Sequence, residues 1–153
     1  MDCVPAMLQA LQAGPEGRFD PEKREQLLQA SSIAGMVIAQ TGTTVVHSMG
    51  YSLTYFKDID HGKANGLLLG EYLRFVEKVQ PDLTERILGA MNLSGVDSFQ
   101  NLMNSLLERK EGISSAEISQ YSKKAIQAKN ISNCVVKPKE EDIRRMFEHS
   151  FVK

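Results

Sequence analysis

The chain has 153 residues, of which 42% are hydrophobic and 24% charged, with a formal net charge of −1 at pH 7. This length predicts one domain with a real core, and the near-zero charge excludes an electrostatic basis for binding nucleic acid or an anionic membrane surface. No apolar run approaches the roughly 18 residues that cross a membrane, and no secretion signal is recognisable, so we expect a cytoplasmic protein.

The first predicted helices lie on either side of a short loop. An apolar pattern predicts a helix over residues 2–13, and glycine and proline predict a loop over 14–19. The Asp-Pro-Glu sequence at 20–22 is a strong helix start, because aspartate caps free N–H groups and proline favours the first helical position. This second helix is expected to run to about Gln40, with an exposed charged beginning and a buried apolar end.

Two of the three histidines lie in the middle of the chain, fourteen residues apart. Residues 41–43 break the preceding helix, and an apolar stripe predicts a helix from there to about Phe56 that carries His47. His61 lies at the mouth of the next apolar helix, which ends before Pro81. A side chain on one helix and another at the start of the next can converge, as metal ligands do in helical domains.

The residue types alone leave two interpretations of these histidines open. A histidine among apolar residues is often a hydrogen-bonded core residue, and this spacing is no standard zinc pattern. Neutral imidazole nevertheless suits iron, zinc, copper or nickel. Beyond His61, glycines recur at Gly62, Gly66 and Gly70, and the charged residues that follow favour close packing in a soluble bundle over a membrane dimer.

The remaining helices follow from caps and apolar periodicity. We expect one from Pro81, one capped by Asp97, one opened by Ser114 or Ser115, and one over 139–151 after an irregular segment. The lysines of the penultimate helix form a solvated face, and the last histidine is a surface residue: Lys123, Lys124, Lys129 and His149. With seven or eight helices and no convincing strand, the chain is predicted to be an all-α multi-helix bundle, a single domain over residues 1–153.

A longer pattern surrounds the two central histidines. It runs through Ala-Gly-Met at 34–36, His-Ser-Met-Gly-Tyr at 47–51, Asp-His-Gly-Lys-Ala-Asn at 60–65 and the leucines at 67–69. This pattern resembles the iron-containing alcohol dehydrogenase family, and the similarity continues over 133–151. The resemblance implies the family's C-terminal helical metal-binding domain, in which two histidines at this separation ligate a catalytic Fe²⁺ or, in some members, Zn²⁺. They would be His47 and His61, ligating as neutral imidazoles, and Asp58 or Asp60 could supply an acceptor for the other ring nitrogen.

Two positions depart from the family's pattern. Tyr51 stands where the family usually carries another histidine near the cofactor and substrate; a phenol can donate a hydrogen bond, but its pKa of about 10 makes it a poor proton shuttle. The family's other ligands are an aspartate and a histidine one turn later. Asp2 could be that aspartate, and Ala6 then stands where the histidine belongs, so one metal ligand is missing.

The resemblance covers only the C-terminal half of the family. The sequence contains no glycine-rich dinucleotide motif and no β-α-β pattern, so the N-terminal dinucleotide-binding domain is absent from it. In the complete family enzyme the metal polarises the alcohol or aldehyde oxygen while hydride passes to NAD(P). NAD(P) would bind only if a separate α/β domain were supplied, and whether this chain is an enzyme is left open.

Three functional hypotheses therefore stand side by side. The first is the C-terminal domain or a truncated form of an iron-dependent alcohol dehydrogenase, not catalytic alone. The second is a non-catalytic remnant that acts as a helical interaction or dimerisation module, partnered by a second copy or by the missing α/β domain. The third is a small metal-dependent hydrolase or sensor, whose third ligand would come from Asp2, Asp58, Asp60 or Glu71.

Overall fold

The structure, a computed structural model, describes residues 20–108 and 112–151. These ranges contain seven α-helices, one 3₁₀ turn and no strand, which confirms the all-α prediction. The predicted helix over 2–13 and loop over 14–19 lie outside the described residues. In chain order the elements are α2 (Pro21–Thr41), α3 (Val45–Lys57), α4 (His61–Glu77), α5 (Pro81–Ala90), α6 (Val96–Leu106), α7 (Ser115–Ile126), η2 (Lys129–Asn133) and α8 (Glu140–Phe151).

The helix boundaries follow local capping signals. The Asp20 carboxylate accepts the backbone N–H of Lys23 at 2.8 Å, and proline follows it at the first helical position, as predicted. Ser114 caps α7 in a reciprocal box with Glu117. The predicted cap of α6 is wrong: Gly95 is the capping residue, and Asp97 lies in the first turn of the helix, where its carboxylate binds Arg74 of α4 at 2.6 Å.

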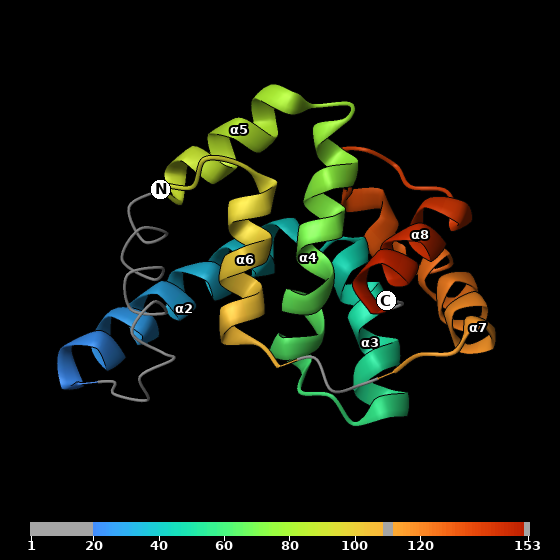
Figure 1. Cartoon of the computed structure of the whole chain (residues 1–153). Coiled ribbons are helices and arrows are strands. Elements are labelled where there is room, and N and C mark those ends of the chain that lie inside the picture. Colours follow the sequence, from blue (N-terminus) through green and yellow to red (C-terminus); the bar gives the residue numbers. More distant parts are fainter. Residues whose placement is uncertain (1–19, 109–111, 152–153) are drawn as a thin grey trace.

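Helix α4 is the centre of the bundle (Figure 1). It packs against α3, α5, α6 and α8, while α3 also packs against α7 and η2, and α7 against α8. The larger apolar core joins α3, α4, α7 and α8, and its most deeply buried members include Met49, Leu53, Leu68, Tyr121 and Phe147. A smaller cluster joins α4 to α5 and α6 through Leu73, Leu88, Val96 and Phe99. Apolar burial on both sides therefore fixes α4.

Glycines allow neighbouring helices to approach α4 closely. A Cβ atom on Gly70 would lie 2.0 Å from Oε1 of Gln100 on α6, and one on Gly66 would lie 2.6 Å from a methyl group of Leu107. The predicted close packing is therefore confirmed at these two positions. A Cβ atom on Gly62 would meet nothing within 4 Å, so the first glycine of the series has no packing role.

Helix α2 corrects one prediction about the core. We expected its apolar end to be buried, but every residue from Ser31 to Thr41 is exposed, and Ala30 is the helix's one buried residue. The exposed side chains include Leu28, Ile33, Met36, Val37 and Ile38. The helix reaches away from the bundle in Figure 1. In the described ranges, no helix has the length and apolar character needed to cross a membrane.

Candidate metal centre

The two central histidines meet where α3 faces the start of α4. His47 lies in the first turn of α3, and His61 is the first residue of α4. Their ring centres are 5.2 Å apart, and the ring planes are inclined by 65°. Both side chains are half-buried. The convergence expected from a histidine on one helix and another at the mouth of the next is therefore present.

His61 is held by two neighbouring polar side chains. Its Nδ1 atom lies 3.4 Å from the hydroxyl oxygen of Thr54, and its Nε2 atom lies 3.1 Å from the amide nitrogen of Asn65. With the amide in this orientation, Nε2 accepts the amide N–H, so Nδ1 carries the ring proton. The Asn65 amide oxygen is buried without a partner among the described residues. Turning the amide over would let this oxygen accept Nε2–H, which would move the lone pair of the ring to Nδ1.

Gly50 is the reason that Asn65 can reach this position. A Cβ atom on Gly50 would lie 2.1 Å from the Asn65 amide oxygen, far inside van der Waals contact. Because Gly50 has no side chain, the Asn65 side chain of α4 fits against the α3 backbone and reaches His61. Thr54 and Asn65 were missed by the sequence reasoning, which expected Asp58 or Asp60 in this role. Both aspartates are exposed on the connection between the helices.

The environment of His47 favours the neutral form of its imidazole. Burial lowers the pKa of the His47 imidazole, and the nearby His61 lowers that pKa further by charge repulsion. A neutral imidazole offers a lone pair to a metal ion, whereas a protonated one does not. Burial therefore favours the form of His47 that could ligate a metal ion.

Tyr51 forms the third wall of this site. Its ring stacks on the His61 ring at 5.3 Å with an interplanar angle of 11°, and it lies edge-on to His47 at 6.4 Å. The phenol side chain is 51% exposed. Tyr51 therefore covers one face of the His61 imidazole. This stacking is the role of the tyrosine at the position where the family usually has a histidine.

The described residues offer two candidate ligands for a metal ion, His47 and His61. Among them, no group of three or more His, Cys, Asp or Glu side chains comes together. Glu71 is engaged elsewhere, by Arg74 and His149, and the two exposed aspartates before α4 make no contact with the histidines that the structure records. Asp2 lies outside the described residues. The third hypothesis, a metal-dependent hydrolase or sensor, therefore finds no third ligand at 58, 60 or 71.

The geometry of the two imidazoles fits a shared ion. Metal–nitrogen bonds of about 2.1 Å place the centres of two ligating rings within about 6 Å of each other, and the observed 5.2 Å meets that limit. The lone pair of His61 points at a partner within the protein, either Asn65 or Thr54. Ligation would replace one of these contacts, and the remaining one would hold the ring, as outer-sphere partners of metal-bound histidines do.

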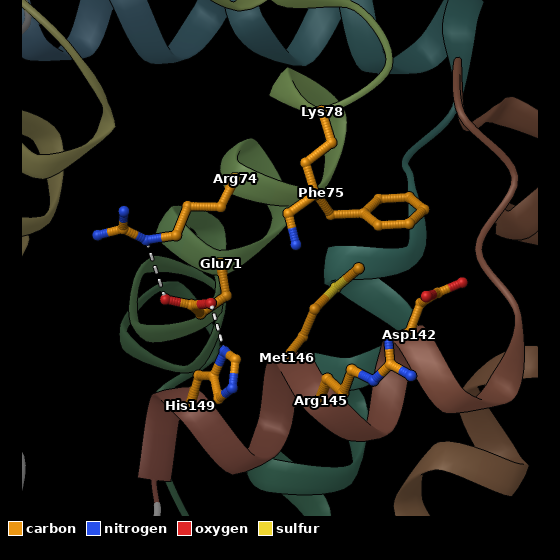
Figure 2. A pocket seen from close by; sticks show the side chains of 8 residues that line it. All are labelled: Glu71, Arg74, Phe75, Lys78, Asp142, Arg145, Met146 and His149. Carbon is orange, nitrogen blue, oxygen red and sulfur yellow. Dashed lines mark hydrogen bonds and ion pairs between the residues drawn. The ribbon is translucent and has the colours of Figure 1, made fainter.

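A separate pocket of about 160 Å³ lies between α4 and α8, and Figure 2 shows the side chains that line it. Glu71 contacts two other lining residues: the Glu71 carboxylate lies 3.2 Å from Nε of Arg74 and 3.2 Å from Nδ1 of His149. His149 is exposed, which confirms the prediction that it is a surface residue. The contact between His149 and Glu71 joins α8 to α4, and the lining of this pocket does not include His47 or His61.

Fold and site together define an all-helical domain with two imidazoles at the junction of its central helices. The sequence matches the C-terminal domain of the Fe-containing alcohol dehydrogenase family over residues 1–151. The structure is similar to the iron-containing alcohol dehydrogenase of Thermotoga maritima, with a TM-score of 0.82 and 30% identity over 97% of this chain and 41% of that one. The chain belongs to the iron-containing alcohol dehydrogenase family, and it corresponds to the family's C-terminal domain.

The similar curated proteins are also alcohol dehydrogenases, and their matches cover a smaller part of this chain than the structural match does. An NADPH-dependent butanol dehydrogenase of Clostridium saccharobutylicum is 30% identical over 113 residues, which is 67% of this chain and 29% of that protein. The bifunctional aldehyde-alcohol dehydrogenase of Escherichia coli is 38% identical over 60 residues, or 39% of this chain and 7% of that protein. The chain thus spans less than a third of the length of either relative.

Proposed function

We propose that this chain is the metal-binding helical part of an NAD(P)-linked alcohol dehydrogenase, in which His47 and His61 supply two ligands to Fe²⁺ or Zn²⁺. The observation that carries the proposal is the 5.2 Å approach of the two rings, and burial lowers the pKa of the His47 imidazole. Family membership supports iron as the ion and NAD(P) as the hydride partner. Alcohol–aldehyde interconversion would belong to the assembled enzyme rather than to this chain alone.

The residues of this chain would hold the ion and orient the imidazole rings that ligate it. A bound ion supplies Lewis-acid polarisation of an alcohol or aldehyde oxygen. His47 offers a neutral imidazole, and Thr54 and Asn65 fix the ring plane and tautomer of His61. Tyr51 covers one face of the His61 ring and can donate a hydrogen bond to a substrate oxygen through its phenol. While they ligate an ion, neither imidazole has a free lone pair with which to abstract a proton from an alcohol.

Metal content tests this proposal directly. We expect the purified chain, incubated anaerobically with ferrous iron or zinc and then desalted, to retain close to one ion per molecule by elemental analysis. His47→Ala and His61→Ala should each abolish retention and leave the helical circular dichroism unchanged. His149→Ala is the matched control and should retain the ion, since that residue binds Glu71. Equal retention in all three variants would contradict the assignment of His47 and His61.

Alcohol turnover tests the second part of the proposal. The chain with added NAD(P) and a primary alcohol should show no turnover, even when it retains metal. Reduced cofactor formed by this chain at a rate that His61→Ala abolishes would show instead that the chain is an enzyme by itself.

A second candidate function rests on α2. Its apolar side chains remain exposed along most of the helix, and contiguous exposed apolar surface marks interaction sites. In this candidate the chain is a non-catalytic module that dimerises or docks an α/β domain through α2. Light scattering on the purified chain separates the outcomes, because a homodimer has twice the monomer mass of 17.0 kDa.

A further inference from the structure

An open hollow of about 460 Å³ lies between α3 and α7, on the side of α3 that carries Tyr51. Three of its lining residues are exposed aromatics on α3, and their exposed fractions are 51% for Tyr51, 82% for Tyr55 and 42% for Phe56. Aromatic side chains gathered around a hollow provide flat apolar contact area for a small organic molecule. The neighbouring α7 contributes Lys124 to the lining, and Ala128 lies just after that helix.

Lys124 gives this hollow a fixed positive charge. Its ammonium nitrogen lies 4.5 Å from the centre of the Phe56 ring, whose plane stacks on Tyr121 at 5.4 Å. The cation–π contact holds the ammonium group over the aromatic wall. In the part of the chain that the structure describes, no carboxylate forms an ion pair with Lys124, and the lining residues include no acidic side chain. The charge is therefore available to an anion.

A buried polar group also lines the hollow. Ser48 is 4% exposed, and its hydroxyl has no hydrogen-bond partner among the described residues. An unpaired buried hydroxyl costs free energy unless a ligand or an ordered water satisfies it. Ser48 directly follows His47 and precedes Tyr51 by three residues, so this group lies on the same helix turn as the candidate metal centre.

We propose that the hollow between α3 and α7 is a binding site for a small carboxylate with an aromatic or apolar body. The carboxylate meets the Lys124 ammonium, and the body lies against Tyr51, Tyr55 and Phe56. The hollow thus selects for a negative charge on one end of the ligand, which separates carboxylates from neutral alcohols of the same shape.

The chain offers a direct optical test, because it contains no tryptophan and two of its four tyrosines, Tyr51 and Tyr55, line the hollow. The probes are 3-phenylpropanoate, its neutral analogue 3-phenylpropan-1-ol and its cationic analogue 3-phenylpropylamine, each titrated against tyrosine fluorescence in metal-free protein. We expect saturable binding in which the carboxylate is at least five-fold tighter than the alcohol and the amine is weakest.

Lys124→Gln should weaken carboxylate binding at least five-fold and leave alcohol binding unchanged, whereas Lys124→Arg should restore the carboxylate preference. Lys123→Gln removes the adjacent exposed lysine, which does not line the hollow, and is the matched control. The proposal is overturned if no probe binds saturably, if the amine binds as tightly as the carboxylate, or if both lysine-to-glutamine variants behave alike. Since no metal is added, these outcomes are independent of the metal test.

Discussion

Asn65 connects the two helices of the candidate metal centre. From α4 it reaches the Nε2 atom of His61, and it occupies the space that Gly50 leaves on α3. A helical residue four positions after a histidine shares its face, so Asn65 could have been found from sequence spacing alone. Residue type favours Asp58 and Asp60 instead, because carboxylates are common outer-sphere partners, and the exposure of these two aspartates cannot be inferred from residue type.

The pair Gly50 and Gly35 makes this arrangement testable. Gly50→Ala drives a methyl group into the Asn65 amide, so we expect metal affinity to fall about 10- to 100-fold, as it does when outer-sphere partners are lost. We expect the unfolding free energy to fall as well, since overpacking costs roughly 1–3 kcal/mol against the roughly 1 kcal/mol gained by replacing a helical glycine.

Gly35→Ala is the control for that substitution. A Cβ atom at Gly35 meets nothing within 4 Å, so this exposed helical position should gain about 0.5–1 kcal/mol in urea unfolding. Equal stabilisation by Gly50→Ala and Gly35→Ala would show that Asn65 moves aside without cost and does not depend on the glycine.

At the scale of the helix, the predictions succeeded where the signal was local. Asp20 and Ser114 cap the helices that follow them because the capping contacts involve residues only three positions away. The start of α6 was misplaced because Asp97 looks like a cap, whereas its carboxylate binds Arg74 on another helix. The residues next to Asp97 in the sequence do not indicate an ion pair with a residue 23 positions away.

A second inter-helix ion pair predicts how stability responds to acid. The Lys57 ammonium at the end of α3 lies 2.6 Å from the Glu117 carboxylate of α7, and this contact, with the N–H and hydroxyl of Ser114, lowers the pKa of Glu117 to about 2 from its ordinary 4.5. The folded state thus holds the proton less tightly than the unfolded state. This contribution to stability is complete above pH 4.5 and disappears as the pH falls toward 2.

Urea unfolding at a series of pH values measures that contribution. Glu117→Gln should remove it, so the variant's unfolding free energy should fall less steeply than the parent's between pH 4.5 and 2. Lys57→Gln removes the largest cause of the lowered pKa and should reduce the slope in the same window. Parallel curves for the parent and both variants would mean that the α3–α7 ion pair does not contribute to stability.

For the whole molecule, apolar periodicity predicted an all-helical core but could not say which helices are covered. The apolar end of α2 was expected to be buried, because its residue types favour burial. Whether a covering surface exists depends on neighbours far away in the chain, and in the described ranges Ala30 alone is buried on this helix. The rings of His47 and His61 converge because α3 and α4 are adjacent in both sequence and space, which made that approach predictable.

The exposure of α2 leads to a prediction about stability. The double substitution Met36→Lys and Val37→Lys should change the unfolding free energy by no more than about 0.5 kcal/mol, because exposed positions contribute little packing. Leu53→Ala, in the core, should cost about 2–5 kcal/mol. Urea unfolding of both variants checks this difference. A cost above about 2 kcal/mol for the lysine pair would show that α2 is covered in solution.

The contribution of α8 to the main core also bears on how the chain is made. Ile143, Met146 and Phe147 close the apolar cluster against α4 and α7, and His149 binds Glu71, 78 residues earlier. Until α8 has been synthesised, the apolar faces of the helices before it therefore lack part of their cover. During that interval, apolar side chains such as Leu68 and Tyr121 are less covered and can contact chaperones or other nascent chains. Completion of α8, rather than of the histidine-bearing helices, ends this exposure.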